Sequence, residues 1–96
     1  MFIASLAVFP TSEGASVSEY VQEVIRVIED SGLKNETGAM STTIESPDLD
    51  SLFRVIQKSH DKLADMGATR IRIELSVDHR LDKEGSITQK LGSIHK

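Results

Sequence analysis

The residues best suited to chemistry lie in the middle of the chain, in a stretch rich in hydroxyl groups. Thr42 and Thr43 precede a carboxylate at Glu45, Met40 stands just before them, and Glu36 lies a little earlier. Hydroxyls can donate or accept hydrogen bonds, whereas a carboxylate only accepts them. With an apolar neighbour, these groups suit a small heteroaromatic ligand, which needs ring burial and a few placed polar groups. Ordinary β-forming threonines explain the same pattern equally well.

Catalytic motifs are missing from the sequence. The serines occur in no nucleophile-elbow pattern, and the isolated glycines form no phosphate-binding loop. The three histidines, His60, His79 and His95, lack metal-ligand spacing, so no zinc site is expected. We therefore expect no catalytic residue, no metal and no cofactor, although fold alone does not decide against an enzyme.

Paired carboxylates are the other chemical possibility. Glu36 and Glu45 could face each other if 34–37 and 41–45 form a hairpin. Acidic residues on neighbouring strands are usually solvated, which is the favoured interpretation. An enzyme would also need His60 or His79 to converge with these carboxylates.

Size, charge and cysteine content narrow the function classes further. The chain has 96 residues, 39% of them hydrophobic, which suits one globular domain spanning 1–96. Its net charge is −4, whereas nucleic-acid binding needs a basic stripe. Cysteine is absent, and the apolar first ten residues have neither the basic flank nor the length of a signal peptide or membrane span. We expect a cytoplasmic protein that binds neither nucleic acid nor membranes.

The elements that must position these residues follow from periodicity and from turn residues. Strands are predicted at 2–9, 34–37, 41–45 and 69–78. Helices are predicted over 17–31 and from Ser46, the expected N-cap, to Gly67. Ser16 and Glu19 have capping-box spacing at the first helix. A weak amphipathic helix within 82–96 must pack on its own domain or on a neighbour, because isolated helices this short rarely form.

This order predicts an α+β, ferredoxin-like βαββαβ two-layer sandwich, with two helices on one face of a four-stranded antiparallel sheet. Strict alternation over 71–77 predicts a last strand with one buried face. The first strand is apolar on both sides, so its second face also needs a cover. We expect either a second copy or the C-terminal helix to provide that cover.

The same alternation distributes the polar residues between the two faces. Ile44 is expected to face the helices together with Thr42, leaving Thr43 and Glu45 on the open face. There they could meet Ser5, whose small side chain leaves room for a ligand. The candidate ligand-binding residues are Ser5, Glu36, Met40, Thr42, Thr43 and Glu45.

The sequence resembles the thiamine-binding protein family of small ferredoxin-like proteins over almost its whole length. The segment 31–45 carries the most specific part of the resemblance, although Ala39 and Ser41 stand where members often have proline and glycine. The other stretches are the first strand ending in Phe9-Pro10, the segment 18–21, and Asp78-His79-Arg80.

The resemblance implies a ferredoxin-like fold, dimers or tetramers, binding of thiamine or its hydroxymethylpyrimidine moiety, and no catalysis. Glu45 could accept from the pyrimidine amine or pair with a protonated ring nitrogen, and Thr42 and Thr43 could donate or accept. The leading hypothesis is a non-catalytic small-molecule binding protein with sites at or near subunit interfaces. The alternative is a structural or regulatory self-association module without a small ligand.

Overall fold

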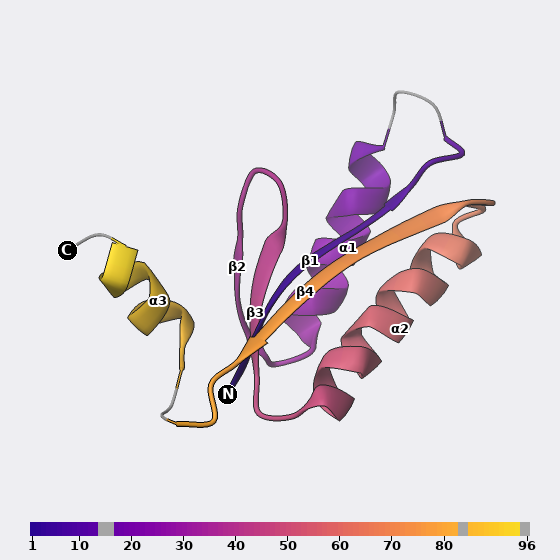
Figure 1. The fold of residues 1–96 in the computed structure, drawn as a ribbon. Helices are drawn as coiled ribbons and strands as arrows, with labels where there is room; N and C mark the ends of the chain where they lie inside the picture. The colour runs from indigo at the N-terminus through magenta and orange to yellow at the C-terminus, as the bar shows by residue number, and fades with distance from the viewer. Residues whose placement is uncertain (14–16, 83–84, 95–96) are drawn as a thin grey trace.

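The computed structural model describes residues 1–13, 17–82 and 85–94. Its elements are β1 (Phe2–Pro10), α1 (Ser18–Asp30), β2 (Lys34–Thr37), β3 (Thr42–Ser46), α2 (Leu49–Asp65), β4 (Ile71–His79) and α3 (Ile87–Ile94). The strands form one antiparallel sheet in the order β2-β3-β1-β4. α1 and α2 lie together on one face, and α3 lies beyond β2, away from these two helices (Figure 1). The predicted α+β, ferredoxin-like sandwich with a short C-terminal helix is confirmed.

The core lies between the central strands and the first two helices. Alternate residues of β1 point toward the helices, because successive side chains of a strand leave opposite faces. They meet the apolar stripes that the 3.6-residue period places along α1 and α2. Burying one such side chain contributes about 1.5–3 kcal/mol relative to leaving it exposed. The buried cluster consists of Ala4, Leu6, Val8, Val24, Ile28, Ile44, Leu52, Val55 and Leu63.

The ends of α1 follow local chain chemistry. The helix begins at Ser18, one residue later than predicted, and its N-cap Val17 supplies no side-chain hydrogen bond. Ser16, the first member of the predicted capping box, lies outside the described residues. At the other end Gly32 has a φ of +81°, which a residue without a Cβ adopts at low cost. The predicted glycine stop is confirmed.

The predicted N-cap of α2 was wrong by two residues. Asp48, not Ser46, precedes the helix, and its Oδ1 accepts a hydrogen bond from the Ser51 backbone N–H at 2.7 Å. That bond, which favours the charged carboxylate, lowers the pKa of Asp48. Ser46 instead ends β3 as a buried residue and donates from Oγ to the Asp48 carbonyl at 2.6 Å.

The predicted buried face of the last strand is exposed in the single chain. Ile73, Leu75 and Val77 point to the helix side, because they pair with the buried Val8, Leu6 and Ala4 of β1. Nevertheless each is between 38% and 42% exposed. β4 lies at the edge of the sheet, whereas α1 and α2 cover the central strands of the sheet. The alternation predicted the correct side for these residues, but their burial depends on the position of the strand in the sheet.

Candidate functional site on the open face of the sheet

A row of polar side chains crosses the face of the sheet that α1 and α2 leave uncovered. In the strand register Ser5 lies opposite both Ser76 and Thr43, and Thr43 lies opposite Glu36. Directly opposed residues of antiparallel strands share a face and lie about 4.5–5.5 Å apart. The register therefore places hydroxyls from three strands beside one carboxylate. We call Ser76, Ser5, Thr43 and Glu36 the polar row.

A second row runs beside the first, two residues along each strand, and is covered by α3. Ile3 lies opposite Asp78 and Glu45, and Glu45 lies opposite Lys34. Ile3 is buried although it points away from the main core, and Ile87 at the start of α3 is buried as well. The expected cover for the second face of β1 is thus provided here by the C-terminal helix. We call Asp78, Ile3, Glu45 and Lys34 the covered row.

Three polar contacts attach α3 to the covered row. The contacts use both backbone and side-chain groups. Because their partners lie on three different strands, they fix both the position of α3 along the row and its distance from the sheet. The predicted weak helix therefore packs on its own domain. The contacts join Lys90 Nζ to Asp78 Oδ2 at 2.7 Å, Ile87 N to Glu45 Oε2 at 3.2 Å, and Lys34 Nζ to Thr88 Oγ1 at 3.1 Å.

A hollow of about 380 Å³ lies between the polar row, the bend after β2 and α3. Its floor carries Thr43 and Glu36, and its α3 side carries the apolar Ile87 and Leu91. Ligand pockets of about 300–1,000 Å³ with mostly apolar walls and a few polar groups are typical of small-molecule sites. Met40 stands at the bend with 89% of its surface exposed. The hollow is therefore large enough for one heteroaromatic ring system.

A smaller hollow of about 190 Å³ adjoins the first over the β1 and β4 end of the polar row. Ser5 and Ser76 contribute to it, and it shares Met40 and Ser41 with the larger hollow. Ser41 also bonds Ser5, with their Oγ atoms 2.8 Å apart. This bond fixes the Ser5 hydroxyl at the boundary between the two hollows.

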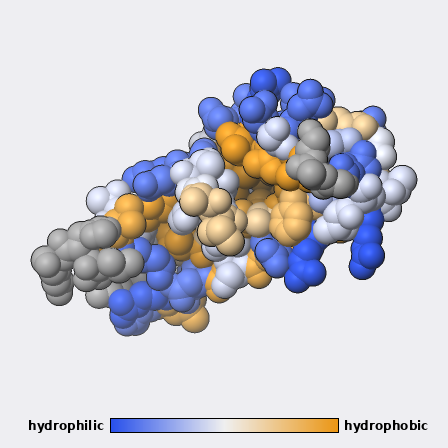
Figure 2. All heavy atoms as spheres, turned by 90° about the horizontal axis from the view of Figure 1, so that it is seen from above, coloured by the Kyte–Doolittle hydropathy of each residue, from blue (hydrophilic) through white to orange (hydrophobic). Residues whose placement is uncertain are grey.

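The structure brings only some of the predicted residues together. Ser5, Glu36 and Thr43 share the polar row, and Met40 borders both hollows on that face. Thr42 lies on the opposite face, 6% exposed, where it lines an apolar hollow of about 230 Å³ between α1 and the bend. Seen from above, hydrophobic atoms gather on that part of the surface (Figure 2).

Glu36 and Glu45, which a hairpin could have brought face to face, do not pair in the sheet. Glu36 lies opposite Thr43, and Glu45 lies opposite Lys34, so the two carboxylates are diagonal neighbours. Thr43 does meet Ser5, as predicted, whereas Glu45 meets Ile3. Strand alternation could place these residues on one face, but the length of the connecting bend sets which of them are opposite.

Two serines of the site were missing from the sequence prediction. Ser41 shares the parity of Thr43 and Glu45, so alternation alone could have placed it on the open face. Ser76 alternates with the apolar residues of β4 and thus faces the same side. Its position in the polar row required the β1–β4 register, which carries no local signal in the sequence.

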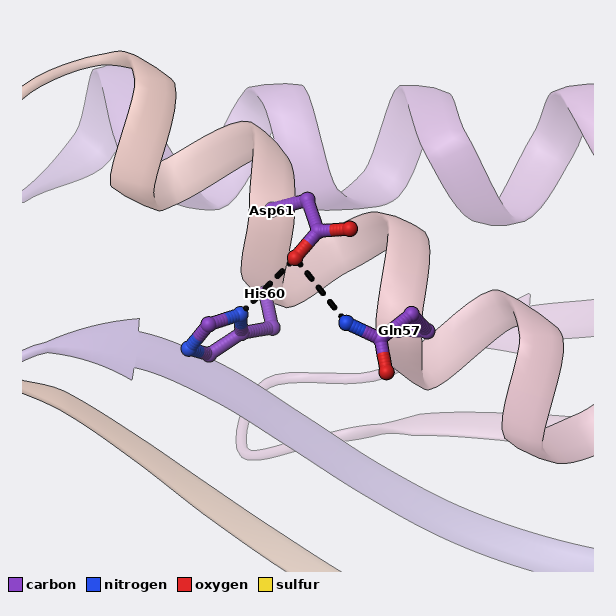
Figure 3. Close-up of polar contacts among 3 residues, drawn as sticks. All are labelled: Gln57, His60 and Asp61. Atoms are coloured by element: carbon purple, nitrogen blue, oxygen red, sulfur yellow. Dashed lines mark hydrogen bonds and ion pairs between the residues drawn. The ribbon is translucent and has the colours of Figure 1, made fainter.

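The histidines do not converge on the carboxylates. His79 stacks on Phe2 with ring centroids 3.8 Å apart, and its strand partner Phe2 belongs to the helix side. His60 on α2 has its Nδ1 3.1 Å from Asp61 Oδ1, which also accepts from Gln57 Nε2 at 3.0 Å (Figure 3). These bonds, the one to His60 first, lower the pKa of Asp61. His95 lies outside the described residues.

The attachment of α3 alters the ionisation of one carboxyl group on the open face. The hydrogen bond and charge of Lys90 lower the pKa of Asp78, so this pair remains ionised well below neutral pH. Within residues 1–13, 17–82 and 85–94, no group of three or more potential ligating side chains could hold a metal ion. Over the same residues, no helix has both the length and the apolarity to cross a membrane.

Comparisons with known proteins identify a family and solved structures that share this fold. A family model described as thiamine-binding protein matches residues 4–95. The UPF0045 protein MJ1052 of Methanocaldococcus jannaschii is 37% identical over 92 residues, covering 96% of this chain and 90% of that protein. Its crystal structure superposes with a TM-score of 0.90 at 36% identity, covering 98% of this chain and 95% of the other.

Other relatives extend the similarity to bacteria. The UPF0045 protein YqgV of Bacillus subtilis is 33% identical over 101 residues, covering all of this chain and 96% of that protein. A structure from Thermotoga maritima, described as a candidate thiamine biosynthesis or salvage protein, has a TM-score of 0.83 at 22% identity, with 97% of each chain covered. At that identity the likeness concerns the fold alone.

Proposed function

This chain belongs to the thiamine-binding protein family, and on that premise we propose that it is a non-catalytic binding protein for thiamine or its hydroxymethylpyrimidine moiety. The observation that carries the proposal is the polar row lying at the floor of a hollow with an apolar side. Such a site can enclose a flat ring and meet its edge with a few directed hydrogen bonds.

The chemistry of an aminopyrimidine matches these groups. The Glu36 carboxylate can accept from the exocyclic amine, and the Thr43 and Ser5 hydroxyls can donate to ring nitrogens. A charge-assisted hydrogen bond is about twice as strong as a neutral one. Ile87 and Leu91 offer apolar surface to the ring, and the thiazolium cation of thiamine favours a carboxylate nearby.

Glu45 and Met40 complete the proposed site at its margins. Glu45 already accepts the Ile87 backbone N–H through Oε2, so it would meet a ligand only at the α3 end of the hollow. Met40 has a flexible, polarisable side chain that adapts to a ring. Thr42 is left out of this site, because it faces the helices.

We further propose that a second copy closes the open side of the site, giving a dimer or tetramer in the cytoplasm. The open face keeps Ala7 and Phe9 of β1 partly exposed, and the adjacent Met40 is almost fully exposed. Apolar surface of this kind commonly marks a contact with another molecule. The proposal thus places the ligand at or near a subunit interface.

Isothermal titration calorimetry of the full chain with thiamine and with hydroxymethylpyrimidine tests the proposal. Replacing Glu36 by Gln removes one charge-assisted bond of about 1.5–3 kcal/mol, so affinity should fall roughly tenfold to a hundredfold. Thr43→Val should weaken binding by a smaller factor. Glu29→Gln, an exposed carboxylate at the end of α1, is the matched control and should change nothing. No heat and no thermal shift with either compound at millimolar concentration would refute ligand binding.

A self-association module without a small ligand is the second candidate. The exposed apolar row of β4 favours it, since that surface is built without any ligand-binding group. This function predicts stable oligomers whose assembly is insensitive to Glu36→Gln and Thr43→Val, together with no calorimetric signal for either compound. Binding of thiamine that both substitutions weaken decides against it.

A further inference from the structure

The larger hollow beside the polar row has one charge of each sign on its walls. Among the described residues that line it, Glu36 is the carboxylate and Lys90 is the cation. Glu36 belongs to β2, whereas Lys90 Nζ lies 2.7 Å from Asp78 Oδ2 of β4. β2 and β4 are the two edge strands, so these charges approach the hollow from opposite edges of the sheet. A ligand in the hollow therefore meets an acceptor from one side and a cation from the other.

Lys90 can bind an anion without losing its contact with the sheet. An ammonium group has three N–H donors, and Asp78 Oδ2 accepts one of them. The Lys90 side chain is 46% exposed, so a ligand can reach the ammonium group. Its position is set by α3, since the Ile87 N–H at the start of that helix is bonded to Glu45. Lys90 is therefore a positioned cation that can hold Asp78 and a ligand oxygen at the same time.

A further hollow of about 310 Å³ adjoins the larger one at Ile3 and Lys90, which line both. Its other charged lining residues are Asp78 and Arg80. The Arg80 side chain is 46% exposed, and it donates two hydrogen bonds to Asp82 out of the five that a guanidinium can make. The space beyond Lys90 thus offers two cations and one carboxylate to a bulky anionic group.

We propose that the site prefers a phosphorylated aminopyrimidine, with the ring on the polar row and the phosphate against Lys90. The inference rests on the proposed function and names the form of ligand that the same site selects. Hydroxymethylpyrimidine and thiamine each carry a primary hydroxyl, which is the group that forms a phosphate ester. The flexible link between ring and ester lets the phosphate turn away from Glu36 and toward Lys90, where the adjoining hollow leaves room for it.

A phosphate ester gains from Lys90 what the parent alcohol does not. The ester carries a charge of about −1.5 to −2 at pH 7, because its second pKa is about 6, and it offers three strong acceptor oxygens. Charge-assisted hydrogen bonds are roughly twice as strong as neutral ones. Since the ammonium group is half-exposed, the gain should be roughly tenfold in affinity. Lys90 is thus a specificity-determining residue, and the preference for the ester should decrease as the pH falls through about 6.

Isothermal titration calorimetry of the full chain with two matched pairs of compounds tests the inference. The pairs are hydroxymethylpyrimidine with its monophosphate and thiamine with its monophosphate, and the ester of at least one pair should bind about tenfold more tightly than its parent. Lys90→Gln should reduce this ratio to about one. Asp78→Asn breaks the same contact with α3 but retains the cation and removes a competing carboxylate, so the ratio should be preserved or increased. The two variants therefore separate the charge of Lys90 from its role in attaching α3.

The matched control is Lys58→Gln, which removes an exposed lysine of α2 on the other side of the sheet and should leave both ratios unchanged. Parent compounds that bind as tightly as their esters would overturn the inference and leave the proposed function in place. A ratio that Lys90→Gln and Asp78→Asn reduce equally would also overturn it, since the loss would then come from the attachment of α3. If none of the compounds binds, the proposed function and this inference both fail.

Discussion

The two edges of the sheet are built in opposite ways. β2 has four residues, Lys34–Thr37, none of them apolar, and Lys34 is bonded to Thr88 of α3. β4 has nine residues with a regular apolar row, and no element of the described chain lies along its outer edge (Figure 1). A short polar strand with a lysine resists pairing, whereas a long regular one invites it. The β2 edge of the sheet thus resists pairing with a further strand, whereas the β4 edge can accept one.

This difference separates two functions in space. The β2 side of the open face, with α3 attached, forms the proposed ligand site, whereas the β4 edge carries an exposed apolar row. A small domain buries a limited fraction of its surface by itself, so an added strand contact contributes stability that the single core cannot supply. Four predictions test how far the two ends differ.

The largest loss of stability should come from a substitution in the core, which serves as the reference for the same substitution in β4. Leu6 and Leu75 are directly paired leucines, 2% and 38% exposed. Leu6→Ala should lower the free energy of unfolding by about 2–5 kcal/mol. Leu75→Ala should cost about 1 kcal/mol in the monomer, since less of its apolar surface is buried. Urea unfolding monitored by circular dichroism measures both values.

The cost of Leu75→Ala is also expected to depend on protein concentration. If β4 pairs with a second copy, the cost of Leu75→Ala should increase between about 1 µM and about 100 µM protein, because association stabilises only the folded chain. The cost of Leu6→Ala serves as the control, since Leu6 is buried within one chain. If the cost of Leu75→Ala is independent of concentration, β4 does not pair with a second copy and does not differ from β2 in this respect.

A smaller effect is expected at the β2 end, where Glu45 anchors α3. Glu45→Ala removes the acceptor for the Ile87 N–H, at a cost of about 1 kcal/mol to the docking of α3. Amide hydrogen exchange at Lys90, whose N–H bonds the Ser86 carbonyl, should accelerate several-fold. Glu45→Gln retains an acceptor oxygen and should have a weaker effect. Glu36→Ala, on the same face without a bond to α3, is the control, and equal acceleration in both alanine variants would contradict the anchor.

The smallest effect is a pH dependence at the Asp78–Lys90 contact. The folded-state pKa of Asp78 lies below its ordinary 3.8 because Lys90 stabilises the charged form. The contact therefore supports α3 fully at neutral pH and is lost as the pH falls through that lowered pKa. An NMR titration of the Asp78 carboxyl carbon should show the midpoint rising in Lys90→Ala. Lys58→Ala on α2 should leave it in place, and an unmoved midpoint in Lys90→Ala would exclude the contact in solution.

Much of the fold could be predicted because it depends on short-range periodicity. The 3.6-residue stripes located α1 and α2, and the stops at Gly32 and Gly67 were confirmed by their positive φ angles. The N-cap of α2 could not be assigned with the same security, because Ser46 and Asp48 are both good caps and sit two residues apart. β3 resolved the ambiguity by extending through Ser46.

The candidate site was predicted in part for the same reason. Alternation alone assigned Thr43 and Glu45 to the open face, where both lie, and it assigned Ile44 to the core. It could not show that Glu45 is bonded to α3, or that Ser76 joins Ser5 and Thr43 in one row. These relations link residues far apart in the sequence, whose register is set by loops and by packing of the whole sheet.

The side to which each side chain points follows from local sequence pattern, since the geometry of a helix or strand fixes the direction of side chains from one residue to the next. Whether that side is buried or exposed to water depends on how the elements pack together. β1 and β4 carry equally apolar rows, but β1 lies in the middle of the sheet under two helices and β4 lies at its edge. The burial of a strand depends on the elements that lie beside it, and the order β2-β3-β1-β4 arises only when the chain has folded.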